Sequence, residues 1–504
     1  MTIRARHAPL AFDAETFKVL GHRLVDQIAE RLAAVAAGPV TPSESPSHVR
    51  EALGLNGRLP EDGTEPKALL EHTVDALFAH SLFNAHPRFM GYITSSPAPI
   101  GMLGDFVASA LNANVGAWTL SPAATEIEVQ TVRWIAEFVG YPSACGGLLV
   151  SGGNMANMVC FWAARAAKAD WDVRTQGTSG GPRLIAYASA ETHTWLQKAA
   201  DLSGMGTDAI RWIPVRDDLQ MDLEALEQAI THDVSAGHRP FLVVGTAGSV
   251  STGVVDPLPE IASICRSRGL WFHVDGAYGG FAAGLHDASP ALRGLCEADS
   301  VAVDPHKWLY APLEAGCALV RTAGLLRAAF AYPPPYSHFA EQATTFVDQG
   351  PQNSRGFRAL KVWLAWRLVG ARGYRQMIAD DIALSQRLAA RVGAEPDLEL
   401  LTQALSITTF RFVPADLRDT RAQQDATSYL NELNRALLDA LQRGGEVFVS
   451  NAVIGGRYAL RSCIVNFNTT TADVDVVPTI AVRLGRSLDA QLRPTALRAG
   501  ASAG

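Results

Sequence analysis

The chain has 504 residues, of which 48% are hydrophobic and 18% are charged, and its formal net charge is −7. A chain of this length exceeds what one small core can organise, so we expect two or three structural units around a well-buried centre. The mild charge and the scattered lysines and arginines argue against nucleic acid or an anionic membrane as a partner.

The cysteines and the apolar runs indicate the cellular compartment of the protein. The six cysteines lie far apart without a CxxC pair, which predicts neither a disulfide framework nor a zinc site, and no other pattern implies a metal. The amino terminus, MTIRARHAPLAFDAET, lacks the apolar centre of a signal peptide, and no run reaches the roughly 18 apolar residues of a membrane span. We therefore expect a soluble cytoplasmic protein.

The amino-terminal region is predicted to be helical. Apolar residues at helical spacing predict an amphipathic helix over residues 13–37, with Asp13 as its cap. Residues 38–66 are rich in Pro, Ser, Gly and Glu, which is typical of an extended connector. A second helix is expected over residues 68–83.

From about residue 145 onward, short apolar runs alternate with helical patterns. This alternation predicts βαβ units, and the uniformly apolar runs indicate a mainly parallel sheet covered on both faces. The predicted strands are GLLV (147–150), LIAY (184–187), FLVVG (241–245), WFHVD (271–275), SVAV (300–303) and CALV (317–320).

The pattern changes after about residue 355, where a long helix, GFRALKVWLAWRLV, begins. Strand-like pieces at 406–412, 446–454 and 458–467 alternate with helices near 375–392 and 425–443. These pieces predict a smaller α+β domain, followed by a frayed carboxyl terminus.

Polar residues gather where the predicted strands end. In open α/β sheets the ligand crevice lies at the carboxyl ends of the strands, so these residues are expected to share one crevice. They are Ser151-Gly152-Gly153-Asn154, Glu191-Thr192-His193, Thr246, Asp275 and Asp304 to Lys307.

Most of these residues also have an ordinary alternative. A Gly-Gly pair is usually only a tight turn, a loop histidine such as His193 is usually solvated, and Asp275 could cap the next turn. However, SGGN stands before a good helix and would present free N–H groups to an anion.

Lys307 is the sharpest signal, because an ammonium group at the end of a core strand is disfavoured unless it is paired or chemically used. An imine with an aldehyde cofactor would remove that cost. Pyridoxal phosphate supplies the aldehyde, an anion for SGGN and a ring nitrogen that pairs with a carboxylate.

Six blocks of sequence carry a resemblance to a known family. They are HPRFMGYITSSP (86–97), LSPAATEIE (120–128), LLVSGGNMAN (148–157), HVDGAYGG (273–280), DPHKW (304–308) and RGFRALKVW (355–363). The chain resembles, over residues 13–490, the group II pyridoxal-phosphate-dependent decarboxylases, which include the aromatic-L-amino-acid and glutamate decarboxylases.

The resemblance implies the aspartate-aminotransferase-like fold type I, an α/β fold, in a homodimer with its sites at the subunit interface. We expect four segments. They are a helical segment packing at the dimer interface (1–95), a large cofactor-binding α/β domain (96–370), a small α+β domain (371–490) and a flexible tail (491–504).

By the same resemblance, Lys307 forms an internal aldimine with pyridoxal phosphate, Asp275 pairs with the pyridinium nitrogen and His193 stacks on the ring. An L-amino acid would lose its carboxylate through an external aldimine and a quinonoid. The remaining expected contacts are Gly153, Asn154 and His306 to the phosphate, Thr246 and Ala277 to the ring, and Ser95 near substrate and cofactor.

The substrate is less strongly encoded. Ile93, Thr94, Ala117 and Trp118 fall in blocks that line the family's side-chain pocket and, with Phe346, favour an aromatic amino acid over glutamate or aspartate. Arg461 resembles a family arginine near the active site, where it either contacts substrate or orders a loop.

In the aromatic decarboxylases a loop tyrosine supplies the final proton, and an ungapped count places Phe346 at or next to it. The reaction would then give the amine, with protonation by His193, Lys307, water or a loop residue such as Tyr332 or Tyr336. Alternatively, as in family members with a phenylalanine at this position, the carbanionic intermediate would react with oxygen and give an aldehyde, ammonia and hydrogen peroxide.

Two other hypotheses compete. An aminotransferase or lyase of the same fold would share Lys307 and Asp275 but would lack the HPRF and DPHKW blocks together. A catalytically silent dimer predicts loss of the lysine or the aspartate, and both are present.

Overall fold

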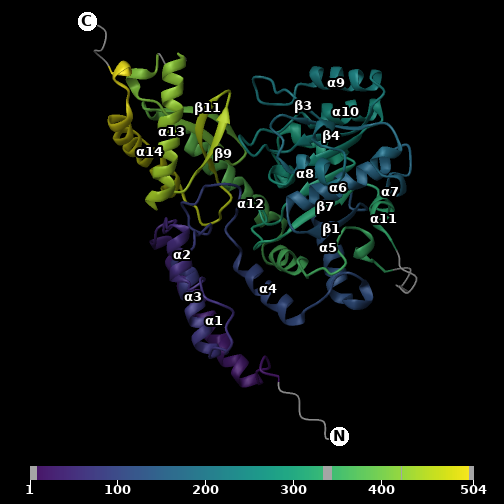
Figure 1. The fold of residues 1–504 in the computed structure, drawn as a ribbon, viewed down its shortest axis with the longest axis horizontal. Coiled ribbons are helices and arrows are strands. Elements are labelled where there is room, and N and C mark those ends of the chain that lie inside the picture. Colours follow the sequence, from purple (N-terminus) through teal and green to yellow (C-terminus); the bar gives the residue numbers. More distant parts are fainter. Residues whose placement is uncertain (1–7, 333–342, 420, 422, 499–504) are drawn as a thin grey trace.

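A computed structural model describes residues 8–332, 343–419, 421 and 423–498. Figure 1 shows a large layered unit with a smaller unit of helices and strands beside it, and the amino-terminal helices extend below the smaller unit in that view. In the part of the chain so described, no helix combines the length and apolar character needed to cross a membrane.

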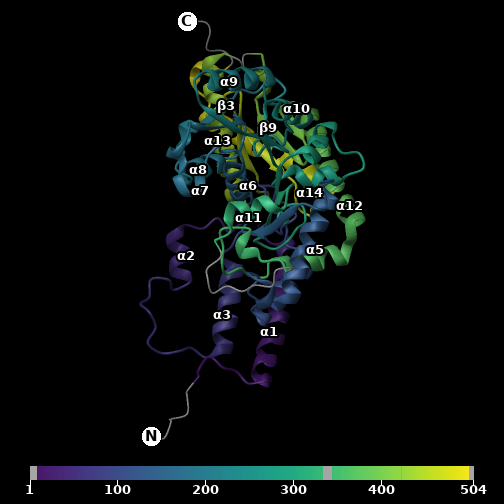
Figure 2. The same ribbon diagram turned by 90° about the vertical axis from the view of Figure 1, so that its right-hand side faces the viewer.

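The first predicted helix and its cap are confirmed. Helix α1 spans Ala14–Ala34, and the Asp13 carboxylate accepts the backbone N–H of Thr16 at 2.7 Å. It lies beside α3 (Pro66–Ala79), and the pair stands clear of the sheet in Figure 2. Within the described residues nothing covers its outer side, and α1 has no buried residue.

The expectation of a purely extended connector was wrong at one place. Helix α2 (Pro46–Ala52) forms within it, because Ser45 accepts the N–H of His48 at 3.2 Å and Pro46 occupies the first turn. Serine and proline, which suggest a loop by composition, here start a helix. Helix α4 (Pro99–Leu111) follows and packs on α12 (Ala359–Ala394).

The large unit is a seven-stranded sheet in the order β1-β7-β6-β5-β4-β2-β3. Strand β7 is antiparallel to both of its neighbours and every other pair is parallel, so the predicted mainly parallel sheet is confirmed. The strands are β1 (Gly146–Val150), β2 (Leu184–Ser189), β3 (Ile210–Ile213), β4 (Arg239–Thr246), β5 (Trp271–Asp275), β6 (Ser300–Val303) and β7 (Gly316–Val320).

Helices cover both faces of the sheet, since all residues of β1, β2, β5, β6 and β7 are buried. Helix α6 begins directly after β1 and packs across β4 to β7. The surrounding helices are α5 (Pro122–Phe138), α6 (Gly153–Lys168), α7 (Val173–Gln176), α8 (Trp195–Leu202), α9 (Leu223–Ser235), α10 (Leu258–Arg268) and α11 (Gly324–Phe330).

The smaller unit holds a four-stranded antiparallel sheet in the order β10-β11-β9-β8. Its strands are β8 (Leu398–Ala404), β9 (Ile407–Phe412), β10 (Ser450–Ile454) and β11 (Arg457–Cys463). The helices α12 (Ala359–Ala394), α13 (Gln424–Gly444) and α14 (Thr471–Leu492) pack with it. Gly370 alone interrupts α12, with φ 63° and ψ 176°. The domain limits remain a prediction.

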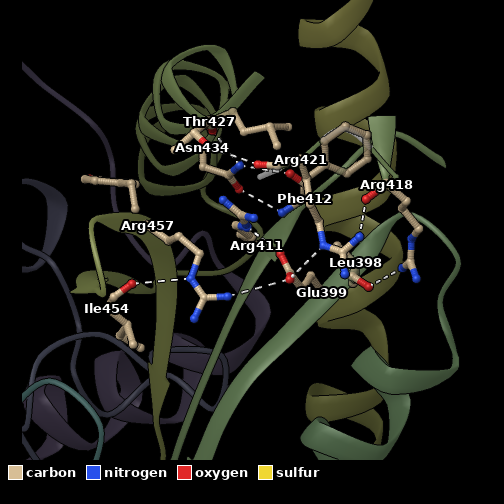
Figure 3. Close-up of polar contacts among 12 residues, drawn as sticks. Leu398, Glu399, Arg411, Phe412, Arg418, Arg421, Thr427, Asn434, Ile454 and Arg457 are labelled. Carbon is tan, nitrogen blue, oxygen red and sulfur yellow. Dashed lines mark hydrogen bonds and ion pairs between the residues drawn. The ribbon is translucent and has the colours of Figure 1, made fainter. Parts of the chain in front are cut away.

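One acidic residue organises the charges of the smaller sheet. Figure 3 shows Glu399 of β8 among the guanidinium groups of Arg411, Arg421 and Arg457. Arg411 is almost fully buried and donates to the carboxylate at 2.6 Å. The single carboxylate therefore compensates a buried cation and draws two exposed ones together.

The HPRF segment joins the two units. Phe89 forms a β-bridge with Phe448, and their rings stack with centroids 5.3 Å apart. Met90 lies in the core of the smaller unit, and the chain then returns to the large unit at Ser95. This path places Ser95 beside the strand ends.

Candidate active site

A small cavity lies at the carboxyl ends of the central strands and brings most of the predicted site together. Ser95 and His306 lie next to its wall, whereas Ile93, Thr94, Trp118 and Phe346 do not line it. The lining residues are Gly153, Asn154, Asn157, His193, Thr246, Gly248, Val250, Asp275, Ala277, Tyr278, Asp304 and Lys307.

Lys307 is paired in this structure. Strand β6 ends at Val303, and the following turn places the Lys307 Nζ atom 3.3 Å from Asp304 Oδ2. Asp304 is buried, and its other oxygen has no hydrogen-bond partner among the described residues. The carboxylate offsets the cost of bringing an amine to the end of a core strand, and its free oxygen leaves room for a further donor.

Two donors fix the carboxylate of Asp275. Trp195 Nε1 donates to Oδ2 at 2.7 Å, and the backbone N–H of Ala277 donates to Oδ1 at 3.2 Å. Asp275 ends β5 and Trp195 begins α8, so two separate elements set one orientation. A carboxylate held in this way is suited to a protonated ring nitrogen.

A buried polar network supports Trp195 from behind. Its indole meets the edge of the His273 ring at 5.6 Å, and burial lowers the pKa of His273 to about 4. Ser300 Oγ accepts the indole N–H of Trp271 at 2.8 Å, so its hydroxyl can donate to His273 Nδ1 at 2.8 Å. We therefore assign the proton of the neutral imidazole to Nε2, which lies 2.7 Å from Asn157 Oδ1.

His193 stands at the cavity wall, and its Nδ1 accepts the backbone N–H of Trp195 at 3.2 Å. The side chain reaches solvent in a single chain, yet burial by the surrounding protein lowers its pKa below the ordinary value of 6.5. His193 is therefore neutral at pH 7, with its proton on Nε2.

The start of α6 forms a cradle that only glycine fits. A Cβ atom on Gly153 would lie 2.5 Å from Asp304 Oδ2 and 2.9 Å from Ala277 Cβ. Gly152 has φ +105°, and no side chain caps the helix. The first N–H groups of α6 consequently have no intrahelical partner, which is the arrangement that binds phosphate at helix starts.

His306 packs against this cradle. Its ring packs against Gly152, its Nδ1 bonds to the carbonyl of Ala315 at 2.8 Å, and burial lowers its pKa. The Ser95 hydroxyl donates to the His306 carbonyl at 2.8 Å. Both residues thus hold the turn that carries Lys307.

Thr246 and Ala277 complete the wall. The backbone N–H of Thr246 donates to Asp256 at 2.8 Å, which fixes the end of β4. Together, a carboxylate for a ring nitrogen, an amine for an aldehyde and an uncapped helix start for a phosphate fit pyridoxal phosphate, and the glycine cradle agrees with it.

The structure places Phe346 in the core. It is 1% exposed, and the Arg355 guanidinium lies 4.5 Å from its ring centroid. Arg355 is itself buried in an ion pair with Glu128. This placement favours a packing role for Phe346, the alternative to a role in proton supply. Tyr336 lies outside the described residues.

The residues expected to form the side-chain pocket do not line the cavity of their own chain. Trp118 donates its indole N–H to Glu126 at 2.9 Å, and Ile93 and Thr94 are half-buried. Ala117 is buried and pairs with Thr345.

Arg461 does not line the cavity but contacts a residue that does. Its guanidinium donates to the carbonyl of Val250, a lining residue, and to Ser450 Oγ at 2.9 Å. The side chain is buried, and burial lowers its pKa. In the described part of the chain, no carboxylate forms an ion pair with it.

Sequence reasoning missed the roles of Trp195, Asp304 and Asn157. Trp195 follows His193 by two positions, but nothing in the sequence shows that its indole reaches the Asp at the end of β5. Asp304 precedes Lys307 by one turn, a spacing that favours pairing of their side chains and gave a usable signal.

This fold and site define an enzyme of the pyridoxal-phosphate class with its lysine at the end of a core strand. Residues 46–413 match the pyridoxal-dependent decarboxylase conserved domain, and the chain belongs to this family of carboxy-lyases. Its cofactor is pyridoxal phosphate.

The relatives are named for two kinds of reaction. The chain is 32% identical to an aromatic-L-amino-acid decarboxylase of Bacillus atrophaeus, covering 92% of this chain and 94% of the relative. It is 29% identical to a phenylacetaldehyde synthase of Arabidopsis thaliana, covering 90% and 92% respectively.

Solved structures share the whole fold. Mouse CSAD superposes with a TM-score of 0.89 at 27% identity, covering 94% of this chain and 99% of that one. Oryza sativa TDC, solved with PLP and tryptamine, gives a TM-score of 0.88 at 27% identity and covers 96% and 100%.

Proposed function

We propose that the enzyme decarboxylates an aromatic L-amino acid to the corresponding amine and CO₂. The observation that carries the proposal is the single cavity that contains Lys307, the doubly held carboxylate of Asp275 and the uncapped start of α6. The aromatic choice is supported by the relative of 32% identity, whose name states that substrate class.

Each residue has a distinct task in this proposal. Lys307 would hold the cofactor's aldehyde carbon, Asp275 its ring nitrogen, and Gly153 and Asn154 its phosphate. When bound, the cofactor supplies a ring that accepts the electron pair left behind by departing CO₂. Asp304 Oδ2 balances charge on the Lys307 Nζ atom and keeps that amine at the strand end.

His193 is suited to hold or pass a proton. Its neutral form carries the proton on Nε2, because Nδ1 accepts the N–H of Trp195. Since burial lowers its pKa, the ring gains a second proton only below about pH 6.5. Activity that depends on neutral His193 should therefore fall on the acid side of that value.

Arg461 would bind the substrate carboxylate. A buried guanidinium without a carboxylate partner is disfavoured, and an amino acid supplies that partner. We expect Arg461→Gln to raise KM by about tenfold or more, with cofactor affinity unchanged. Arg457→Gln is the matched control, because Arg457 lies on the same strand but contacts Glu399. An unchanged KM would leave Arg461 with only the loop-ordering role.

Amine is preferred over aldehyde as the product because of the position of Phe346. The aldehyde hypothesis depends on Phe346 replacing a proton donor, and a ring packed on Arg355 in the core is poorly placed for that role. Tyr332 is 72% exposed at the edge of the described segment, with the Arg174 guanidinium 4.1 Å from its ring. Of the two loop tyrosines considered from the sequence, Tyr332 is the one that lies within the described residues.

The second candidate function is oxidative decarboxylation to the aromatic aldehyde, ammonia and hydrogen peroxide. It is supported by the Phe346 position in the sequence and by the phenylacetaldehyde synthase among the relatives. Incubation of the cofactor-loaded protein in air with L-Phe, L-Tyr, L-Trp, L-Dopa and L-Glu, with mass spectrometry of products and a peroxide assay, separates the two. Amine without peroxide supports our proposal, whereas aldehyde with stoichiometric peroxide refutes it.

We also propose a homodimer in the cytoplasm. No residue of α1 is buried, and Phe17 and Val25 are 54% and 49% exposed. Helices α1, α3 and α4 line an apolar groove of about 440 Å³, which a second copy would cover. Sedimentation should give a dimer, and Val25→Glu should shift it toward monomer. A wild-type monomer at working concentration would contradict the proposal.

A further inference from the structure

Two histidines and a glutamate converge far from the cavity. Glu44 directly precedes the Ser45 cap of α2, His48 lies in the first turn of that helix, and His80 ends α3. In the described part of the chain, this is the one group of three or more such side chains whose ligand atoms all lie within 4.8 Å of one another. We call these three residues the connector cluster.

Both oxygens of Glu44 face imidazole nitrogens. Oε2 lies 2.7 Å from His80 Nδ1, and Oε1 lies 3.3 Å from His48 Nε2. The two rings meet edge to face, with centroids 5.9 Å apart. Two separate helices thus present nitrogen to one carboxylate.

We propose that the connector cluster binds one divalent transition-metal ion of the zinc type. Two imidazoles and one carboxylate form a three-ligand set for zinc that leaves the fourth position to water. With bonds of about 2.0–2.2 Å, tetrahedral ligand atoms stand roughly 3.4 Å apart. The two observed separations, 2.7 and 3.3 Å, are slightly shorter than that value, and all the ligand atoms lie within 4.8 Å of one another, so binding needs only small side-chain shifts.

The exposure pattern fits a site that an ion can reach. The side chains of Glu44 and His80 are about one-fifth exposed, whereas His48 is 59% exposed. The competing explanation is a pair of imidazole–carboxylate hydrogen bonds without a metal. That explanation predicts no stoichiometric binding, which separates it from the proposal.

The ion would fasten the connector to the end of α3. Nearby, Val40 donates its N–H to Gly445 at 2.9 Å and accepts that of Phe83 at 3.3 Å. The chain then runs from His86 to Ser95, which holds the Lys307 turn. Binding at the connector cluster would therefore stabilise the path into the smaller unit without touching the cavity.

The test is a metal titration of the full-length, cofactor-loaded enzyme after treatment with chelator and removal of free cofactor. We expect one Co²⁺ per chain, detected by visible absorption bands of nitrogen and oxygen ligation, and displacement by Zn²⁺. Zn²⁺ should also raise the Tm and slow proteolysis of the 38–66 connector. Absence of stoichiometric binding to the wild-type protein would overturn the proposal without any variant.

Variants then locate the ion. His48→Gln, His80→Gln and Glu44→Gln should each weaken Co²⁺ binding by about tenfold or more. His72→Gln, on the exposed side of α3, and Cys296→Ser, which removes the exposed thiol, should bind as wild type does. Equal binding by the wild type and by all three cluster variants would place the ion elsewhere and refute the proposal.

Discussion

Replacement of Gly153 by alanine tests the phosphate cradle directly. The added Cβ would lie 2.5 Å from Asp304 Oδ2, whereas ordinary contacts begin at 3.4 Å, so the overlap approaches one ångström. Asp304 cannot yield easily, because it is buried and faces both Lys307 and His306. Relief requires a shift of the first turn of α6.

Overpacking of this kind costs about 1–3 kcal/mol. If the shift moves the free N–H groups of α6 away from the phosphate, that energy corresponds to a loss of about five- to 150-fold in cofactor affinity. If the turn does not shift, the same energy appears as a lower Tm.

The assay is a titration of the cofactor-free protein with pyridoxal phosphate, followed by absorbance, together with thermal unfolding. Gly393→Ala is the matched control, because Gly393 lies in the last turn of α12 and an added Cβ meets nothing within 4 Å. That variant should keep wild-type affinity and gain up to about 1 kcal/mol of stability. Gly153→Ala with unchanged affinity and Tm would refute the cradle.

Three further predictions follow from buried contacts. Trp195→Phe removes the donor to Asp275 Oδ2 and should lower kcat/KM by about tenfold while the protein stays folded. Glu399→Gln leaves the buried Arg411 guanidinium without its carboxylate partner and should lower the free energy of unfolding in urea by about 3 kcal/mol without changing kcat. Asp475→Asn, which breaks an exposed ion pair, should lower it by less than about 1 kcal/mol. The pKa of His273 is about 4 in the folded protein and about 6.5 in the unfolded chain. Its contribution to the free energy of unfolding is therefore complete above pH 6.5, and about 3 kcal/mol is lost as the pH falls to 4. His273→Asn should make the free energy of unfolding depend less steeply on pH in this range.

Much of the large unit could be predicted because its strands are buried on both faces. Uniform apolar runs marked every strand of the large sheet except the edge strand β3, which has only four residues and includes Arg211 and Trp212. The antiparallel direction of β7 left no mark in CALV, since a buried strand has the same composition in either direction. Composition also hid α2, because Ser45 and Pro46 are common both in loops and at helix starts.

Some residues of the candidate site could likewise be predicted from the sequence, and others could not. Lys307, Asp275 and His193 stand directly at or after strand ends, so strand position alone brought them together. Trp195 and the connector cluster depend on how helices lie against each other. Glu44 and His48 are four residues apart, but the third member, His80, is distant in the sequence and only the fold brings it to them. Phe346 was judged by its count from Arg355, and a count does not reveal that its ring lies buried against that guanidinium.

The central claim is that Lys307 carries the cofactor, and peptide mapping after borohydride reduction tests it most directly. We predict a phosphopyridoxyl mass on the peptide that contains Lys307, and neither that mass nor any product from the Lys307→Ala variant. A label on a different lysine, or amine formed by Lys307→Ala at the wild-type rate, would contradict the account.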